Sequence, residues 1–255
     1  MRSTANLLLA GLGAMVLLAA SASAQMVASR DLTSGWRPPS DHISLPQSCE
    51  KSSSFIADGD DASANGQKDS RAKASPDLEL TILSTTPEKL EIDGDFVASL
   101  RLKDVGQKAV LIPAVADGEQ LQKAEASGTE EKFEVGDITF RLGTGDHHGA
   151  PVFLSSSGAL FANPDDEKSY VALKPGNWVE LTIHGSVQCG AAQCLGGIQP
   201  DKKAVLTAWW YQRVLTHKVN GCEETHGSYN VREVDSAPLT IEVNEASPKM
   251  SARVW

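Results

Sequence analysis

A short loop near the middle of the chain holds the residues best suited to acid–base or metal chemistry. In GTGDHHGAP, Asp146, His147 and His148 are adjacent and are flanked by glycines. Imidazole exchanges protons near neutral pH and is a common metal ligand, and a carboxylate complements it in both roles. Because neighbouring residues rarely converge on one ion without a third partner, we expect a solvated turn here, with a metal or hydrolase site as the alternative.

No established catalytic signature accompanies this loop. The chain has no G-x-S-x-G nucleophile elbow, no H-E-x-x-H motif, no P-loop and no dinucleotide fingerprint. The acidic stretch that begins at Asp58 departs from the EF-hand pattern, because Ala62 and Ser63 stand where that pattern needs a ligand and a glycine. We therefore expect a non-catalytic protein without a cofactor. The alternative is a secreted hydrolase or metal-dependent enzyme that uses the histidine-containing loop.

A second group of residues suits binding rather than catalysis. In TAWWYQR the adjacent Trp209 and Trp210 must point to opposite faces of a strand. If Trp210 faces the core, Trp209 and Tyr211 face outward, and Trp178 on the preceding strand does the same. Exposed aromatic rings beside polar residues suit stacking on sugars or packing on another protein. We therefore expect Trp178, Trp209 and Tyr211 to share one docking face for a glycan or an envelope protein, unless the protein's own N-terminal arm covers it.

The first residues have the pattern of a secretory signal peptide. Arg2 precedes an apolar stretch from Leu7 to Ala20, and SASAQ then places Ala22 and Ala24 at the small positions of an A-x-A cleavage site. The apolar stretch is short for a membrane span, and no later segment is apolar enough to cross a membrane. We therefore expect cleavage between Ala24 and Gln25, and a secreted or periplasmic mature protein.

The charge of the chain argues against some classes of partner. Its 33 acidic and 23 basic side chains give a formal net charge of −10. An acidic chain without a basic run is a poor ligand for nucleic acid or for an anionic membrane surface. We therefore expect neither as a partner, and the oligomeric state is left open.

The four cysteines fit disulfide bonds better than a metal or redox site. Cys189 and Cys194 lie five positions apart, which matches neither a zinc knuckle nor a C-x-x-C redox motif, and Cys49 and Cys222 stand alone. An even number of cysteines in an exported chain predicts disulfides. The strand that follows the glycine-rich loop would carry Cys222 to the opposite end of the fold, beyond bonding reach of that loop. We therefore expect the pairs Cys189–Cys194 and Cys49–Cys222.

Composition divides the chain into a signal peptide, residues 1–24, and four further segments. Residues 25–47 combine three prolines with a few large apolar side chains, which predicts an extended N-terminal arm. Residues 48–75 are rich in Ser, Asp, Ala, Gly and Lys and too poor in apolar residues to form a core, so we expect a flexible linker. Residues 76–245 carry the pattern of a folded domain, and residues 246–255 form a short tail.

After Pro76 the hydrophobic pattern alternates with a period of two. The segments that show it, separated by turn signals, are DLELTIL, DFVASLRLK, DITFRLG, WVELTIHGSV and PLTIEVNE. Alternate side chains of a strand point to opposite faces, so each segment is expected to have one buried and one wet face. AVLIPAV and KAVLTAWWYQRVL are expected to form further strands. Amphipathic strands without intervening helices predict an all-β fold, an antiparallel β-sandwich, with a closed barrel as the alternative.

The C-terminal third resembles the bacterial immunoglobulin-like domains of exported proteins. LKPGNWVELTI is followed by the strand AVLTAWW and then by SAPLTIEV. The resemblance implies an immunoglobulin-like sandwich and supplies no catalytic residues, and the Cys…Trp…Cys spacing of antibody domains is absent. Together these observations predict an exported, non-catalytic binding or structural module of the cell envelope or the extracellular space.

Overall fold

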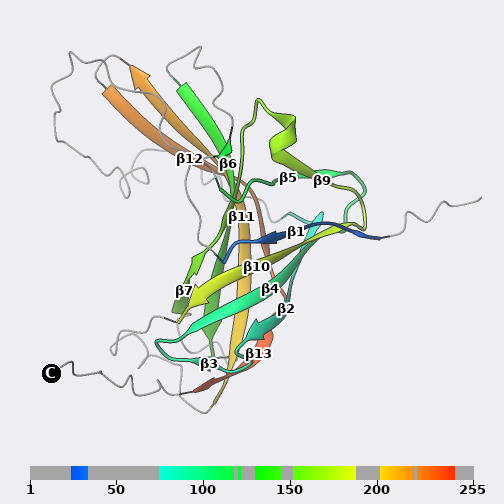
Figure 1. Ribbon diagram of the computed structural model, residues 1–255, viewed down its shortest axis with the longest axis vertical. Helices are drawn as coiled ribbons and strands as arrows, with labels where there is room; N and C mark the ends of the chain where they lie inside the picture. Colours follow the sequence, from blue (N-terminus) through cyan, green and yellow to red (C-terminus); the bar gives the residue numbers. More distant parts are fainter. Residues whose placement is uncertain are drawn as a thin grey trace, which may run out of the picture.

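The computed structural model of the protein describes residues 24–33, 75–117, 120–121, 130–144, 152–187, 202–220 and 223–244. Of these residues, 72 % lie in β-strands and almost none in a helix, which confirms the predicted all-β class (Figure 1). A short 3-10 helix, η2 (Glu167–Ser169), precedes β9. The strands are β1 (Met26–Asp31), β2 (Leu78–Thr86), β3 (Leu90–Glu91), β4 (Asp95–Asp104), β5 (Val110–Pro113), β6 (Glu130–Gly143), β7 (Val152–Ser157), β8 (Ala159–Ala162), β9 (Tyr170–Leu173), β10 (Trp178–Ser186), β11 (Lys202–Asn220), β12 (Glu223–Asp235) and β13 (Leu239–Asn244).

The strands form where the sequence alternates between apolar and polar residues. In β4, Phe96, Ala98, Leu100 and Leu102 are buried, and the residues between them are partly exposed. The same alternation runs through β10 and the first part of β2. Because one face of each of these strands is apolar, neighbouring strands can enclose a common core.

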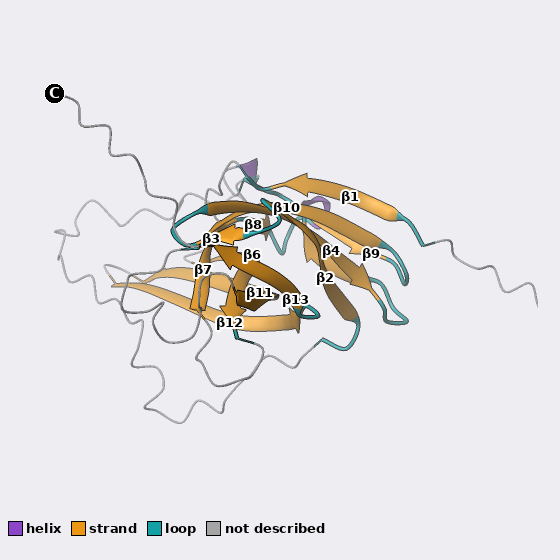
Figure 2. Ribbon diagram, turned by 90° about the horizontal axis from the view of Figure 1, so that it is seen from below, coloured by secondary structure: helices purple, strands orange, loops and turns teal. Residues whose placement is uncertain are grey.

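One long sheet curls over so that two of its parts face each other. Its strands follow the order β2-β4-β10-β7-β6-β11-β13-β3. Strand β7 is the link, because its first half pairs with β6 and its second half pairs with β10. The part that contains β2, β4 and β10 is bent into a half-barrel and lies over β6, β11 and β13 (Figure 2).

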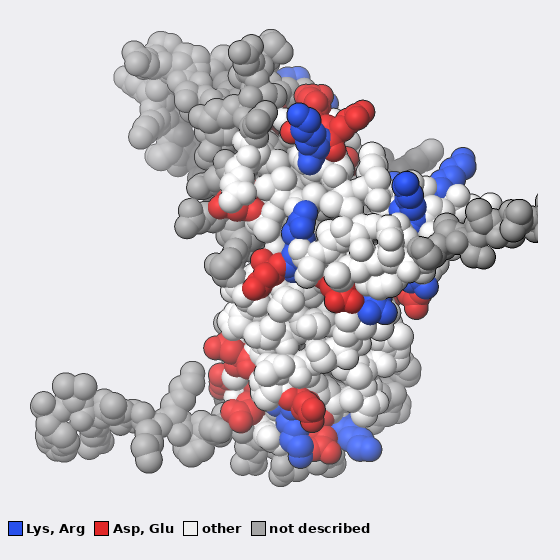
Figure 3. Space-filling model, turned by 45° about the vertical axis from the view of Figure 1, so that its right-hand side comes forward, with Lys and Arg blue, Asp and Glu red and all other residues white. Residues whose placement is uncertain are grey.

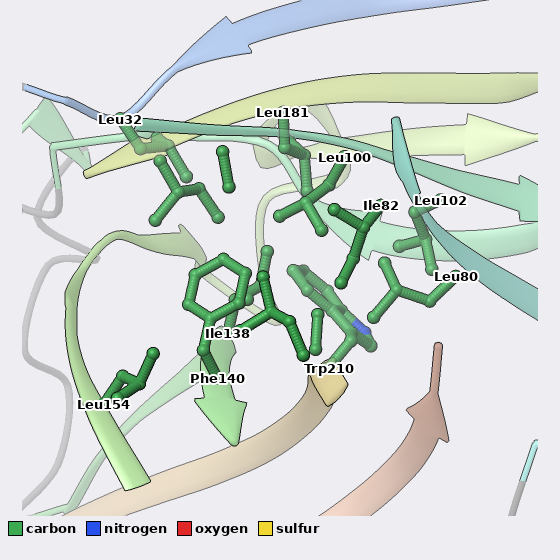
Figure 4. Packing of buried hydrophobic residues seen from close by; sticks show 14 of the residues in the cluster. Leu32, Leu80, Ile82, Leu100, Leu102, Ile138, Phe140, Leu154, Leu181 and Trp210 are labelled. Carbon is green, nitrogen blue, oxygen red and sulfur yellow. The ribbon is translucent and has the colours of Figure 1, made fainter. Parts of the chain in front are cut away.

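The main core fills the space between these two parts (Figure 4). Leu100 and Leu181 come from the half-barrel, and Ile138, Phe140 and Trp210 come from the opposite part. The rings of Phe96 and Phe140 meet edge to face across the core, with centroids 5.3 Å apart and planes inclined by 76°. Each large side chain buried in this way contributes roughly 1.5–3 kcal/mol through removal of apolar surface from water.

Two of the core aromatic rings lie directly over glycines of neighbouring strands. A Cβ atom built on Gly136 would lie 2.1 Å from Cη2 of Trp210, and one built on Gly185 would lie 2.5 Å from Cζ of Phe96. Trp210 is fully buried, in agreement with the alternation of β11. Glycine is therefore required at both positions by the close approach of a ring to the backbone.

An immunoglobulin-like sandwich is not confirmed, because most strands belong to one large curled sheet. The strands of Trp178 and Trp209 follow each other in the sequence but do not pair, because β7 and β6 lie between β10 and β11. In addition, β12 comes from a segment without clear alternation and pairs along β11. Alternation specifies which face of a strand is buried but leaves open which strand lies beside it.

The start of the predicted arm forms a strand at the edge of β10. β1 runs parallel to the first part of β10, while β7 pairs with the last part of β10 on the same side (Figure 1). After β1, the N–H of Leu32 donates to the carbonyl of Thr182 at 2.8 Å, and the Leu32 side chain enters the main core. β1 therefore extends the sheet sideways and does not lie over its outer surface.

Candidate functional site: the outer face of β6, β11 and β12

The candidate site lies on the side of β6, β11 and β12 that points away from the main core, which we call the outer face. In β11 the even-numbered residues Leu206, Ala208 and Trp210 are buried, and the odd-numbered residues between them are only partly covered. Trp209 and Tyr211 therefore stand on the outer face. Their ring centroids are 5.1 Å apart, with planes inclined by 44°.

Two arginines extend this aromatic pair into a row of four side chains. The guanidinium of Arg141 on β6 lies 4.9 Å from the ring centroid of Trp209, and that of Arg213 lies 5.5 Å from the ring centroid of Tyr211. Arg141 is paired with Thr207, two residues before Trp209, so it flanks the indole on the side opposite Tyr211. The order along the sheet is thus Arg141, Trp209, Tyr211, Arg213, which we call the ladder.

Each arginine of the ladder also has a carboxylate partner from an adjacent strand. Arg213 lies 2.8 Å from Asp137 of β6, and Arg141 pairs with Asp235 of β12. Burial raises the pKa of the Asp137 carboxyl, and the charge of Arg213 opposes this shift. Burial, followed by the charge of Asp137, raises the pKa of the Tyr211 hydroxyl. The ladder is therefore electrically balanced, with one carboxylate for each guanidinium.

The two ends of the ladder have different neighbours. Beyond Arg213, a second apolar cluster occupies the outer face; it consists of Leu121, Val135, Ala159 and Phe161, with Val115, Phe133 and Leu215 packed against it. At the other end, Phe153 of β7 is the register partner of Arg141 and is 58 % exposed. One end of the ladder thus adjoins an apolar cluster, and the other adjoins a large apolar side chain that is exposed to solvent.

This arrangement determines what the aromatic rings can bind. Trp209 has a guanidinium on one side and Tyr211 on the other, and Tyr211 has Trp209 and Arg213 as its two neighbours. Cation–π contacts of this kind contribute about 0.5–1 kcal/mol each at partly exposed sites. Each ring therefore has a guanidinium over one face and the other ring, tilted, beside it, and the surface next to them presents the Phe153 side chain.

Trp178 does not belong to this surface. It lies on β10, where Arg101 is 4.8 Å from its ring centroid and its indole N–H donates to Glu180 at 3.2 Å. Glu180 also pairs with Arg101 at 2.9 Å. Because β10 and β11 lie on opposite sides of the main core, Trp178 and Trp209 point away from each other. The predicted docking face shared by Trp178, Trp209 and Tyr211 is therefore divided between two surfaces.

The other predicted site residues lie outside the described part of the chain. These are the loop residues Asp146, His147 and His148 and the cysteines Cys49, Cys189, Cys194 and Cys222. Within the described ranges, no group of three or more His, Cys, Asp or Glu side chains is arranged to hold a metal ion. The same ranges contain no helix long and apolar enough to span a membrane.

Sequence reasoning missed most of the residues that surround Trp209. Arg141 and Asp137 lie on the polar side of an alternating segment, and Arg213 continues the odd-numbered series of β11, so their orientation toward the outer face was predictable. Their contact with the rings was not, because it depends on β6 pairing with β11. The sequence did not indicate that Phe153 belongs to this surface, because its segment has no regular alternation of apolar and polar residues.

In the view of Figure 3, acidic and basic side chains lie in mixed groups, without a large region of a single sign. A surface of this kind does not favour a polyanion or a polycation on that face.

Comparisons with known proteins do not assign the chain to a family. No family model matches it, and no curated protein matches it. Solved structures that it resembles include the Pseudomonas fluorescens alkylpurine DNA glycosylase AlkC bound to DNA with an abasic site analogue, at 11 % identity and a TM-score of 0.22. A beta-glucosidase from Listeria innocua is matched at 13 % identity and a TM-score of 0.25. The chain covers only 30 % and 16 % of these two proteins, and 61 % and 66 % of its own length is aligned. Similarity at this level carries no argument about fold or function.

Proposed function

We propose that the chain is an exported, non-catalytic module that binds another protein through the outer face. The observation that supports this most directly is the exposed Phe153 beside a ladder of Arg141, Trp209, Tyr211 and Arg213. Tryptophan, tyrosine, phenylalanine and arginine are the residue types enriched in protein interfaces, and Trp, Tyr and Arg dominate their binding energy.

A protein partner accounts for the geometry better than a glycan. Sugars stack on an aromatic ring through its flat face, and the faces of Trp209 and Tyr211 are already flanked by other side chains. A partner protein needs no free ring face, because it can pack against Phe153 and against ring edges. The ladder also holds its side chains in fixed positions before binding, which reduces the entropy lost on association.

The chemistry of the surface indicates which groups the partner should present. Phe153 needs an apolar pocket or side chain, and Arg141, whose side chain is 28 % exposed, can donate its remaining N–H groups to backbone carbonyls. Because Asp235 and Asp137 already balance the two guanidiniums, a strongly acidic partner gains little from this surface. We therefore expect a mostly apolar contact with a polar rim.

The test uses the mature protein as bait in an extract of the cell envelope, with matched single variants. Phe153→Ser and Arg141→Gln should each lose the captured protein, while Val105→Ser should retain it. Val105 is the matched control because it is also a large exposed apolar residue, but it lies in the turn after β4. Each variant is first shown to unfold cooperatively, and the interaction is then repeated with the purified partner.

Three outcomes would contradict the proposal. Equal binding by the wild type and all three variants would show that the outer face is not the docking surface. Binding of a purified polysaccharide that is lost in Trp209→Ala would show that a ring face is available after all, and that the ligand is a glycan. Hydrolysis of a generic substrate by the mature protein would support the alternative reading as an enzyme.

A further inference from the structure

At the start of β10, the buried side chain of Asn177 accepts a hydrogen bond from the first residue of the predicted mature chain. The backbone N–H of Gln25 donates to Oδ1 of Asn177 at 3.2 Å, and the carbonyl of Gln25 accepts from the N–H of Trp178 at 3.2 Å. The backbone of Asn177 is fixed in its turn by a bond from its N–H to the carbonyl of Lys174. The position of Gln25 is therefore fixed by hydrogen bonds of both its backbone N–H and its backbone carbonyl.

The neighbouring strand carries a buried carboxylate with an unused oxygen. Asp104, the last residue of β4, is 0 % exposed. Its Oδ1 accepts from the N–H of Gly106 at 2.8 Å, but its Oδ2 has no hydrogen-bond partner among the described residues. Leaving a buried carboxylate oxygen without a donor is costly, so this atom indicates that a donor or a positive charge belongs nearby.

The strand register places Asn177 between Gln25 and Asp104. Lys103 is the partner of Trp178, so Asp104 comes opposite Asn177, and the N–H of Asp104 donates to the carbonyl of Asn177 at 3.0 Å. Both side chains are buried, so they lie on the same face of the sheet. β1 lies on the edge of β10 opposite to β4. Asn177 therefore lies between the nitrogen of Gln25 and the carboxylate of Asp104, although its Nδ2 does not donate to Oδ2 of Asp104 in this structure.

We propose that Asn177 holds the new N-terminal ammonium of Gln25 where its positive charge offsets the carboxylate of Asp104, so that removal of the signal peptide completes this site. The proposal rests on the predicted cleavage after Ala24, and it is independent of the docking surface on the outer face. Hydrolysis adds one water across the Ala24–Gln25 bond and leaves a carboxylate on Ala24 and an ammonium on Gln25. Oδ1 of Asn177 accepts from this ammonium, which places a positive charge on the side of Asn177 away from Asp104.

The chemical reason lies in what cleavage changes at the nitrogen of Gln25. In the precursor this nitrogen is a neutral amide with one N–H. In the mature chain it is a cation with three N–H donors, and hydrogen bonds from a charged donor are roughly twice as strong as neutral ones. A positive charge held at Asn177 offsets the buried negative charge of Asp104 across the Asn177 side chain, and because Gln25 is exposed, water screens part of this attraction.

The test compares the stability of two versions of the chain, one that begins at residue 25 and one that begins at Ser21. Both are released without extra residues by a specific protease from an N-terminal fusion. Both carry Gln25→Ala, because an N-terminal glutamine can cyclise and lose its charge, whereas only the backbone of this residue contacts Asn177. Urea denaturation then gives the unfolding equilibrium constant of each version, alone and combined with Asp104→Asn or Asn177→Leu.

We expect the version that begins at residue 25 to have an unfolding equilibrium constant roughly fivefold smaller than the longer version, as a charged donor replaces a neutral one. Asp104→Asn and Asn177→Leu should each reduce this ratio to near one, even if they also change overall stability. Equal constants for the two lengths would overturn the proposal. A ratio that persists unchanged in Asp104→Asn would also overturn it, because the extra residues would then act without the carboxylate.

Discussion

Replacing Gly136 with alanine should destabilise the protein, because the new methyl group would occupy the space of the Trp210 ring. The built Cβ atom lies 2.1 Å from Cη2 and 2.4 Å from Cζ2 of that ring, well inside the carbon–carbon contact distance of about 3.5–4.0 Å. Trp210 is fully buried among core side chains, so its ring cannot move into solvent. Overpacking of this kind costs typically 1–3 kcal/mol, and we expect Gly136→Ala to lower the free energy of unfolding by about 2–3 kcal/mol.

A second substitution shows whether this cost arises from that contact. Trp210→Phe removes the ring atoms nearest to Gly136, and the cavity that it leaves should cost about 2 kcal/mol on its own. In the double variant the methyl group enters this cavity, so the combined loss should be smaller than the sum of the single losses by at least about 1 kcal/mol. Urea denaturation followed by circular dichroism measures all four proteins. Strictly additive losses would refute the packing of Trp210 over Gly136.

Two further predictions concern Asp137 and β1. Burial raises the pKa of the Asp137 carboxyl, so in the folded protein this carboxyl keeps its proton at pH values where it has lost it in the unfolded chain. The contribution of Asp137 to the free energy of unfolding therefore declines as the pH rises from about 4 through the raised pKa. Asp137→Asn removes that decline, so the free energy of unfolding of the variant, relative to that of the wild type, should increase over the same pH range. If urea titrations gave the same difference between the two proteins at every pH, the raised pKa of Asp137 would be contradicted. Leu32→Ala should cost about 2–4 kcal/mol because this side chain is buried in the main core, whereas Val27→Ala on the exposed side of β1 should change stability by less than about 0.5 kcal/mol. Equally small effects of these two substitutions in thermal or urea unfolding would show that β1 does not dock on β10.

The sequence indicated which face of each strand is buried, but it did not indicate which strands lie side by side. The opposite orientations of Trp209 and Trp210 follow from the geometry of any regular strand, and the structure places them accordingly. The position of Trp178 relative to them depends on strand order, which short-range patterning does not determine. The three aromatic residues that were predicted to share one face therefore lie on two surfaces, one on each side of the main core.

The same distinction explains which parts of the candidate site were missed. The ladder exists because β6 pairs with β11 over most of its length, which brings Arg141 and Asp137 beside residues some seventy positions away. Strand β12 was missed because EETHGSYNVREVD has few large apolar residues, and it is held instead by its long pairing with β11. Strand pairing of this kind depends on tertiary contacts, so the local sequence does not predict it.

The measurement that tests the central claim most directly is site-specific photo-crosslinking from position 153 in the producing cells. A photoreactive phenylalanine analogue replaces Phe153 in one strain and Val105 in another. If the outer face binds a protein, the analogue at 153 should give a discrete crosslinked species, which disappears when Arg141→Gln is added, and the analogue at 105 should not give it. No crosslink from position 153, or the same species from both positions, would contradict the account.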